Sequence, residues 1–294
     1  MQQKTKYGGI VILSAALCLL LHILLPAALT TETPPDSLSG LAQQLGFPLT
    51  ALLWALMAYG CLAVVFYLIG NRIPGKTSAR GRRYGIAIGA LWLLGYVMCL
   101  PKFGNPFTAE LAGGLCDALP VLIMGEMLGR ITDSKFTPDT MLPLPRVPVF
   151  APLTMFTLVF FLARTAAYYL DLINIGLQLN AAYTLGWTLL MGLALGLFYI
   201  LLGQAVTTTA ALNRAFRFGF LLFGSIWGSF IMFFPLILQG ELFHTLRMLL
   251  IDMLAVTAAY YWAERSHVAP QQTKKPLDSA LGQKSKRLCE INRL

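Results

Sequence analysis

The chain has 294 residues, of which 57% are hydrophobic and only 12% charged, and its mean hydropathy is +0.68. Soluble domains carry roughly a quarter charged residues, so this composition excludes an ordinary soluble protein and indicates a polytopic membrane protein. The formal net charge of +9 would suit a nucleic-acid partner only if the basic residues gathered in one domain. The five cysteines form no Cys-x-x-Cys pair, so no disulfide framework, metal site or cofactor is predicted.

Hydrocarbon about 30 Å thick requires roughly 20 apolar residues in a helix. This criterion predicts an all-α transmembrane helix bundle of about eight spans. In chain order they are Gly8–Leu29, Pro48–Ile69, Tyr84–Leu100, Glu110–Gly129, Val149–Leu170, Tyr183–Leu202, Phe218–Leu238 and Glu241–Trp262. We expect the first span to remain uncleaved, because its apolar run exceeds the usual core of a signal peptide.

The segments between the spans suggest how the chain is divided. Residues 132–148 contain four prolines, each of which withholds a backbone donor and disfavours helix. We therefore predict a boundary here, within a transmembrane domain of residues 1–265, between two four-span halves of about 1–131 and 149–265. Residues 266–294 form a polar, basic tail. A short match between Leu119–Leu128 and Leu197–Val206 indicates either an internal repeat or chance.

Nineteen of the 22 lysines and arginines lie in alternate loops and in the two terminal segments. Such an excess marks the cytoplasmic side, so both termini are predicted to lie in the cytoplasm, with the chain in the cytoplasmic (inner) membrane of the cell. The positive charge is then explained by topology. We expect membrane lipid as a partner and no nucleic acid bound by this domain.

Ionisable residues inside the spans are the candidate functional residues, because a charge in hydrocarbon is costly. Helical spacing places several of them at a similar depth in the predicted outer half, about 10 Å from its surface. We predict a polar pocket there that binds a small anionic or polar ligand, lined by Asp117, Arg164, Tyr168, His244, Arg247 and Asp252. The alternative is that these charges form structural ion pairs that fix helix packing, with the two arginines extending outward.

Two further residues have simpler interpretations. Glu126 lies four residues before Arg130, so an i,i+4 ion pair at the membrane interface is predicted, with a proton-coupling carboxylate as the alternative. His22 is alone in the first span and is expected to be a packed, neutral histidine. The motifs of intramembrane proteases are absent, so no catalytic residue is predicted and we do not expect an enzyme.

The loop GNRIPGKTSARGRR resembles the signature loop of the major facilitator superfamily through Gly70, Arg72, Gly81, Arg82 and Arg83, but lacks that signature's acidic residue. The resemblance implies a facilitator-like bundle that transports a solute, reduced from the family's usual twelve spans. In the tail, KSKRLCEINRL is similar to the segment that precedes the helix-turn-helix of membrane-anchored LuxR-type regulators with facilitator-like sensor domains.

These resemblances favour an integral membrane protein that binds and transports a small polar or organic solute. The main alternative is the membrane sensor domain of a LuxR-type regulator that lacks its helix-turn-helix and contacts a cytoplasmic partner through the tail. A third interpretation is a non-catalytic membrane scaffold subunit.

Overall fold

The computed structural model describes residues 2–29, 37–98, 100–132, 150–206 and 210–268. Within these ranges the chain is helical, apart from turns and one isolated β-bridge between Leu38 and Leu238. Eight helical segments are long and apolar enough to cross a membrane. The prediction of an all-α bundle with eight spans is therefore confirmed, and the protein is a multi-pass membrane protein.

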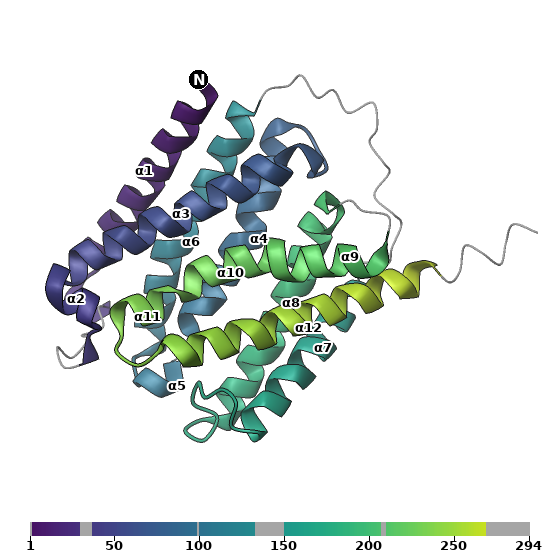
Figure 1. Cartoon of the computed structure of the whole chain (residues 1–294). Helices are drawn as coiled ribbons and strands as arrows, with labels where there is room; N and C mark the ends of the chain where they lie inside the picture. Colours follow the sequence, from purple (N-terminus) through teal and green to yellow (C-terminus); the bar gives the residue numbers. More distant parts are fainter. Residues whose placement is uncertain (1, 30–36, 99, 133–149, 207–209, 269–294) are drawn as a thin grey trace, which may run out of the picture.

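Several spans contain more than one helical segment, as Figure 1 shows. The first four spans are built from α1 (Gln2–Ile23), α3 (Phe47–Ile69), α4 (Thr77–Val97) with α5 (Leu100–Phe103), and α6 (Phe107–Ile131), and the short α2 (Gly40–Leu45) precedes α3. The next two are α7 (Phe150–Tyr169) and α8 (Ala181–Leu202). The seventh combines α9 (Ala211–Phe216), a π-helical turn (Arg217–Phe223), α10 (Gly224–Ile231) and α11 (Phe233–Ile237), and the eighth is α12 (Leu242–Val268).

The predicted boundaries differ from the structure mainly where basic residues extend a helix. The third span begins at Thr77 and the seventh at Ala211, seven residues earlier in each case than predicted. Arg80, which we expected in a loop, lies in the first turn of α4, where its Nε donates a 2.6 Å hydrogen bond to the carbonyl oxygen of Gly75. Arginine is a good helix former, so positive charge at a span end marks the membrane surface without ending the helix.

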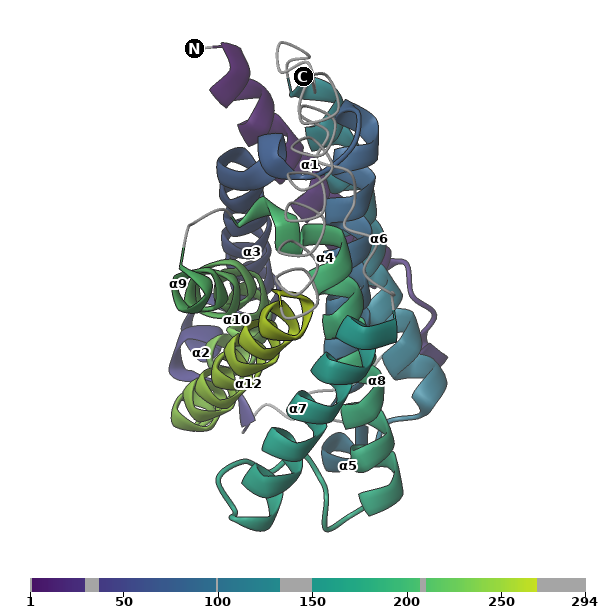
Figure 2. The same ribbon diagram turned by 90° about the vertical axis from the view of Figure 1, so that its right-hand side faces the viewer.

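The spans pack in the same order within each set of four. The second span contacts the first, the first contacts the fourth, and the fourth contacts the third. This order is α3–α1–α6–α4 in the first half (α1 to α6) and α8–α7–α12–α10 in the second half (α7 to α12). The halves meet where α4 packs on α8 and where α10 packs on α3, which closes a ring in which α1 and α7 lie far apart (Figures 1 and 2). A duplicated four-span unit would produce this pattern, which pairs the fourth span with the eighth. The short sequence match between the fourth and sixth spans does not follow it.

Glycines allow α4 and α6 to approach closely in the first half. A Cβ atom placed on Gly81 would lie 2.1 Å from the carbonyl oxygen of Gly125, and one on Gly85 would lie 3.1 Å from the backbone of Leu122. Small residues at such a crossing permit the van der Waals packing that associates helices in lipid. Gly81, a residue of the facilitator-like loop, thus has a packing role within α4.

Aromatic side chains fill the centre of the ring. Trp54 of α3, Trp92 of α4 and Phe230 of α10 contact one another with ring centroids 5.3 to 6.4 Å apart. All three are buried, and they come from both halves. The seam between the halves is therefore a packed apolar contact at this depth.

Some predictions fall outside the described residues. They are the proline-rich boundary at 133–148, the helix-turn-helix-like segment of the tail, and most of the basic tail itself.

Candidate functional site

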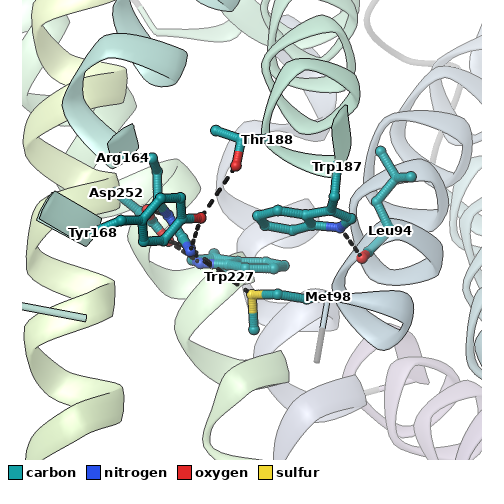
Figure 3. Close-up of polar contacts among 8 residues, drawn as sticks. All are labelled: Leu94, Met98, Arg164, Tyr168, Trp187, Thr188, Trp227 and Asp252. Atoms are coloured by element: carbon teal, nitrogen blue, oxygen red, sulfur yellow. Dashed lines mark hydrogen bonds and ion pairs between the residues drawn. The ribbon is translucent and has the colours of Figure 1, made fainter. Parts of the chain in front are cut away.

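A buried ion pair joins α7 to α12. The guanidinium of Arg164 donates from Nε to Oδ1 of Asp252 and from Nη2 to Oδ2, both at 2.6 Å. Neither side chain is exposed. This two-pronged geometry is the strong form of an arginine–carboxylate contact, and it forms between the two spans that pack together in the second half (Figure 3).

The remaining polar groups of the pair are also satisfied. Nη1 of Arg164 donates to the hydroxyl of Tyr168 at 3.3 Å, and both terminal nitrogens lie 3.9 Å from the sulfur of Met98. The indole N–H of Trp227 donates to Oδ2 of Asp252 at 2.8 Å. The guanidinium carbon lies 5.2 Å from the ring centre of Trp187, a cation–π contact. The pair therefore contacts side chains from the third, sixth and seventh spans and ties five spans together, counting its own two. Figure 3 shows these side chains around the pair.

A depression of about 360 Å³ lies beyond this pair, at the end of the bundle formed by α5, the 170–180 loop and the start of α12, here called the α5 end. Its lining comes from both halves. Lys102 is contributed by α5, whereas Glu241, His244 and residues 174–179 belong to the second half. The Nζ atom of Lys102 lies 2.6 Å from Oε1 of Glu241, so an ion pair crosses the seam between the halves at this point.

His244 has a defined tautomer in this depression. The backbone N–H of Asn174 donates to its Nε2 at 3.0 Å, which requires that nitrogen to be unprotonated. Its Nδ1 lies 3.3 Å from Oε2 of Glu241 and is the remaining site for the proton. The hydrogen bond from His244 and the ammonium of Lys102 lower the pKa of Glu241 from 4.5 to about 2, against the effect of burial.

A second, much smaller cavity of about 10 Å³ lies between the depression and the ion pair. It shares Lys102, Glu241 and His244 with the depression and is also lined by Met98, whose sulfur contacts Arg164. The hydroxyl of Thr245, another lining residue, is buried with no hydrogen-bond partner among the described residues. A cavity of this size holds about one water molecule. The space between the depression and Arg164 is therefore almost filled, and the side chains around Lys102 separate the two.

The prediction that all four span charges share one pocket is wrong. Arg247 is exposed on the outside of α12, five residues before Asp252. Five residues correspond to about 140° around a helix, so only one of the two side chains faces the bundle. This exposed position agrees with an outward-extending arginine, whereas Arg164 is fully buried. Arg164 and Asp252 instead form a structural ion pair, which is the alternative that we weighed.

Asp117 lies in a separate cluster within the first half. Its Oδ1 is 3.1 Å from Nε2 of His22 and 3.2 Å from Sγ of Cys18, both on α1. The hydroxyl of Tyr59 donates to its backbone carbonyl at 3.2 Å. The side chain of Asp117 is only 4% exposed. His22, which we expected to be a packed, neutral histidine rather than a ligand, therefore contacts a buried carboxylate.

Glu126 forms the predicted i,i+4 pair. Its Oε1 accepts hydrogen bonds from Nε of Arg130 and from the hydroxyl of Ser78, each at 2.8 Å, and Arg82 is 3.8 Å away. Glu126 lies near the end of α6, at the end of the bundle opposite the depression. Held by two arginines and remote from the depression, it is poorly placed to couple proton movement to binding.

Some residues of these sites were missed by sequence reasoning. The i,i+4 spacing of Cys18 and His22 puts both on one face of α1 and could have indicated the first cluster. Lys102 is one of only three basic residues outside the loops and terminal segments that hold the other nineteen, and this position is itself a signal. Met98 and Trp227 carry no signal, because each is one of many apolar residues in a span.

Comparison with protein-family models, curated proteins and solved structures finds no match to this chain. The function of this eight-span membrane protein is therefore inferred from the geometry of these sites.

Proposed function

We propose that the protein is a membrane carrier that binds a small polar, preferentially anionic solute in the depression at the α5 end. The observation that carries this proposal is the position of the depression across the seam between the halves, with Lys102 on one side and Glu241 and His244 on the other. A volume of about 360 Å³ lies at the lower end of the range typical of small-molecule sites.

The contacts beneath the depression have the form of a closed gate. The Lys102–Glu241 pair links the halves there, together with backbone hydrogen bonds of Ser37 and Ser39 with residues 237 and 239, and His244 supports the carboxylate from the first turn of α12. An anionic solute that bound Lys102 would compete with Glu241 for it. Separation of the two would enlarge the small cavity toward Met98 and Arg164, since both cavities share these residues.

The packing order of the spans supports this mechanism. Many secondary transporters consist of two related halves, with the solute between them, and work by rocking one half against the other. Here the seam is closed by aromatic packing between α4 and α10, by hydrogen bonds from Tyr183 and Trp187 of α8 to backbone carbonyls of α4, and by the Lys102–Glu241 pair at the α5 end. The facilitator-like loop remains a resemblance that agrees with a carrier, with four spans per half where facilitators have six.

Flux into proteoliposomes tests the proposal. Labelled phosphate, lactate, glutamate and glucose are the probes, and we expect saturable uptake of at least one of the three anions. In the Lys102→Gln variant, the half-saturation concentration for uptake of that anion should rise by at least about tenfold. This is the equivalent of ~1.4 kcal/mol for a lost charged hydrogen bond. Arg130→Gln, which removes an exposed ion pair at the opposite end, is the matched control and should leave uptake unchanged. Uptake no greater than in empty liposomes, or equal loss in both variants, would contradict the proposal.

A sensor is the second candidate, and the continuity of α12 favours it. Glu241 and His244 flank the start of this helix, which runs without interruption for 27 residues to Val268 and leads into the C-terminal segment. Solute binding at the depression would thus act directly on a rigid element that reaches the other end of the bundle. Altered protease sensitivity of residues 269–294 when a probe anion is added, with no flux, would select the sensor over the carrier.

A further inference from the structure

The charged clusters of the two halves occupy equivalent places. Asp117 and Asp252 each lie ten residues after the first residue of their helices, Phe107 and Leu242. Each cluster contains the carboxylate and a pair of side chains with i,i+4 spacing on the first span of its own half; Asp117 contacts both members of its pair, whereas Asp252 contacts Arg164, which in turn contacts Tyr168. The pair is Arg164 and Tyr168 in the second half, and Cys18 and His22 in the first.

The two clusters differ in how the carboxylate is neutralised. Asp252 has a permanent cation, the guanidinium of Arg164, in contact with both of its oxygens. Asp117 is equally buried, with 4% of its side chain exposed, but faces a thiol and an imidazole, neither of which has a fixed charge. A carboxylate inside a span requires a positive partner or a proton. We infer that Cys18, His22 and Asp117 form a site for a transition-metal ion of the Zn²⁺ class, which takes the place that Arg164 fills in the other half.

The distances suit such an ion. The Sγ atom of Cys18, Nε2 of His22 and a carboxylate oxygen of Asp117 all lie within 4.8 Å of one another. The two contacts to Oδ1 measure 3.2 Å from Sγ and 3.1 Å from Nε2. Around a tetrahedral ion with metal–ligand bonds of about 2.0 to 2.3 Å, ligand atoms stand roughly 3.3 to 3.7 Å apart. The two contacts to Oδ1 are thus within about half an ångström of the spacing that such an ion requires, and the sulfur and the imidazole nitrogen lie within 4.8 Å of each other.

Neighbouring side chains contact two of the three ligand residues. The hydroxyl of Tyr59 donates to the backbone carbonyl of Asp117, and the ring of Tyr96 stacks on His22 with centroids 6.1 Å apart and an interplanar angle of 26°. Supporting contacts of this kind orient metal ligands and raise affinity. Cys18 is 1% exposed, whereas 31% of the His22 side chain is exposed, so an ion would enter on the histidine side.

The donor set selects the class of ion. A thiolate, an imidazole and one carboxylate oxygen suit Zn²⁺ and Co²⁺, while Mg²⁺ and Ca²⁺ require oxygen ligands. Three protein ligands leave a fourth position for solvent or another ligand, as in zinc sites that are not purely structural. Ion binding releases the thiol proton of Cys18, which becomes a thiolate on the metal.

The test uses the full chain, purified in detergent, stripped of metal with a chelator and titrated with Co²⁺ and then Zn²⁺. We expect one Co²⁺ per chain, visible d–d bands of a tetrahedral ion, and a near-ultraviolet thiolate-to-cobalt band, all abolished by stoichiometric Zn²⁺. Cys18→Ser should remove the thiolate band, and Asp117→Asn should weaken Zn²⁺ binding at least about 100-fold, since even supporting residues cost 10- to 100-fold. Cys61→Ser, which alters another free thiol of the bundle, is the matched control and should change neither signal.

The wild-type spectrum decides the question even if a variant fails to fold. Absence of stoichiometric Co²⁺ and Zn²⁺ binding to the wild-type chain would overturn the inference. A thiolate band that persists in Cys18→Ser would also overturn it. The outcome is independent of the solute proposal, because the ligands lie in the first half on α1 and α6, and none lines the depression.

Discussion

The ion pair between Arg164 and Asp252 provides the sharpest test of how this bundle is held together. Arg164→Met leaves the carboxylate of Asp252 buried with one remaining partner, the indole N–H of Trp227. Asp252→Leu leaves a guanidinium with no exposed surface. Each single change therefore creates an uncompensated buried charge, which costs about 3–5 kcal/mol.

The hydrogen bonds of the pair give a similar free-energy cost for each single substitution. Two charged hydrogen bonds of 2.6 Å join the side chains, and bonds of this kind contribute about 1.5–3 kcal/mol each, or ~3–6 kcal/mol together. The double variant removes both charges, although it also leaves the indole N–H of Trp227 without its carboxylate acceptor. We expect it to lie within about 2 kcal/mol of the wild-type protein, since replacing a buried pair by apolar residues is often neutral.

Unfolding in mixed detergent and SDS micelles, followed by tryptophan fluorescence, measures the free energy of unfolding of the wild-type protein, the two single variants and the double variant. Trp187 and Trp227 both contact the pair and report on it directly. Arg130→Met serves as the control, because Arg130 is 71% exposed and loss of a surface pair costs at most about 1 kcal/mol. If the two single losses simply add in the double variant, the pair does not stabilise the fold in the way described.

Two further predictions concern packing and pH. Gly81→Ala would place a methyl group 2.1 Å from a backbone oxygen of α6 and should destabilise the protein by about 1–3 kcal/mol. Gly60→Ala is the control, because Gly60 has open space around it and its substitution should not destabilise the protein. Equal SDS unfolding midpoints for the two variants would refute the close crossing of α4 and α6. The pKa of Glu241 is lowered from 4.5 to about 2 by His244 and Lys102, so its contribution to stability is complete above pH 4.5 and is lost as the pH falls toward 2. Stability of the wild-type protein should therefore decline over that window more steeply than that of Glu241→Gln, and parallel pH profiles would contradict the pairing.

The number and approximate position of the spans could be predicted from the sequence, because the length of an apolar run is a local property matched to the thickness of the bilayer. The same holds for the i,i+4 pair of Glu126 with Arg130, which depends only on helical spacing. Ionisable residues in the spans were also correctly singled out as unusual. Their cost in hydrocarbon does not depend on which helices become neighbours.

Which charges meet was decided by the tertiary structure. Asp117 and Asp252 look alike in the sequence, yet one faces Cys18 and His22 and the other faces Arg164, because each half packs its first span against its fourth. The order of helices around the ring depends on contacts between residues far apart in the chain, many of them apolar and locally indistinguishable. Local pattern therefore determines where the chain crosses the membrane, and packing between distant spans determines which side chains share a site.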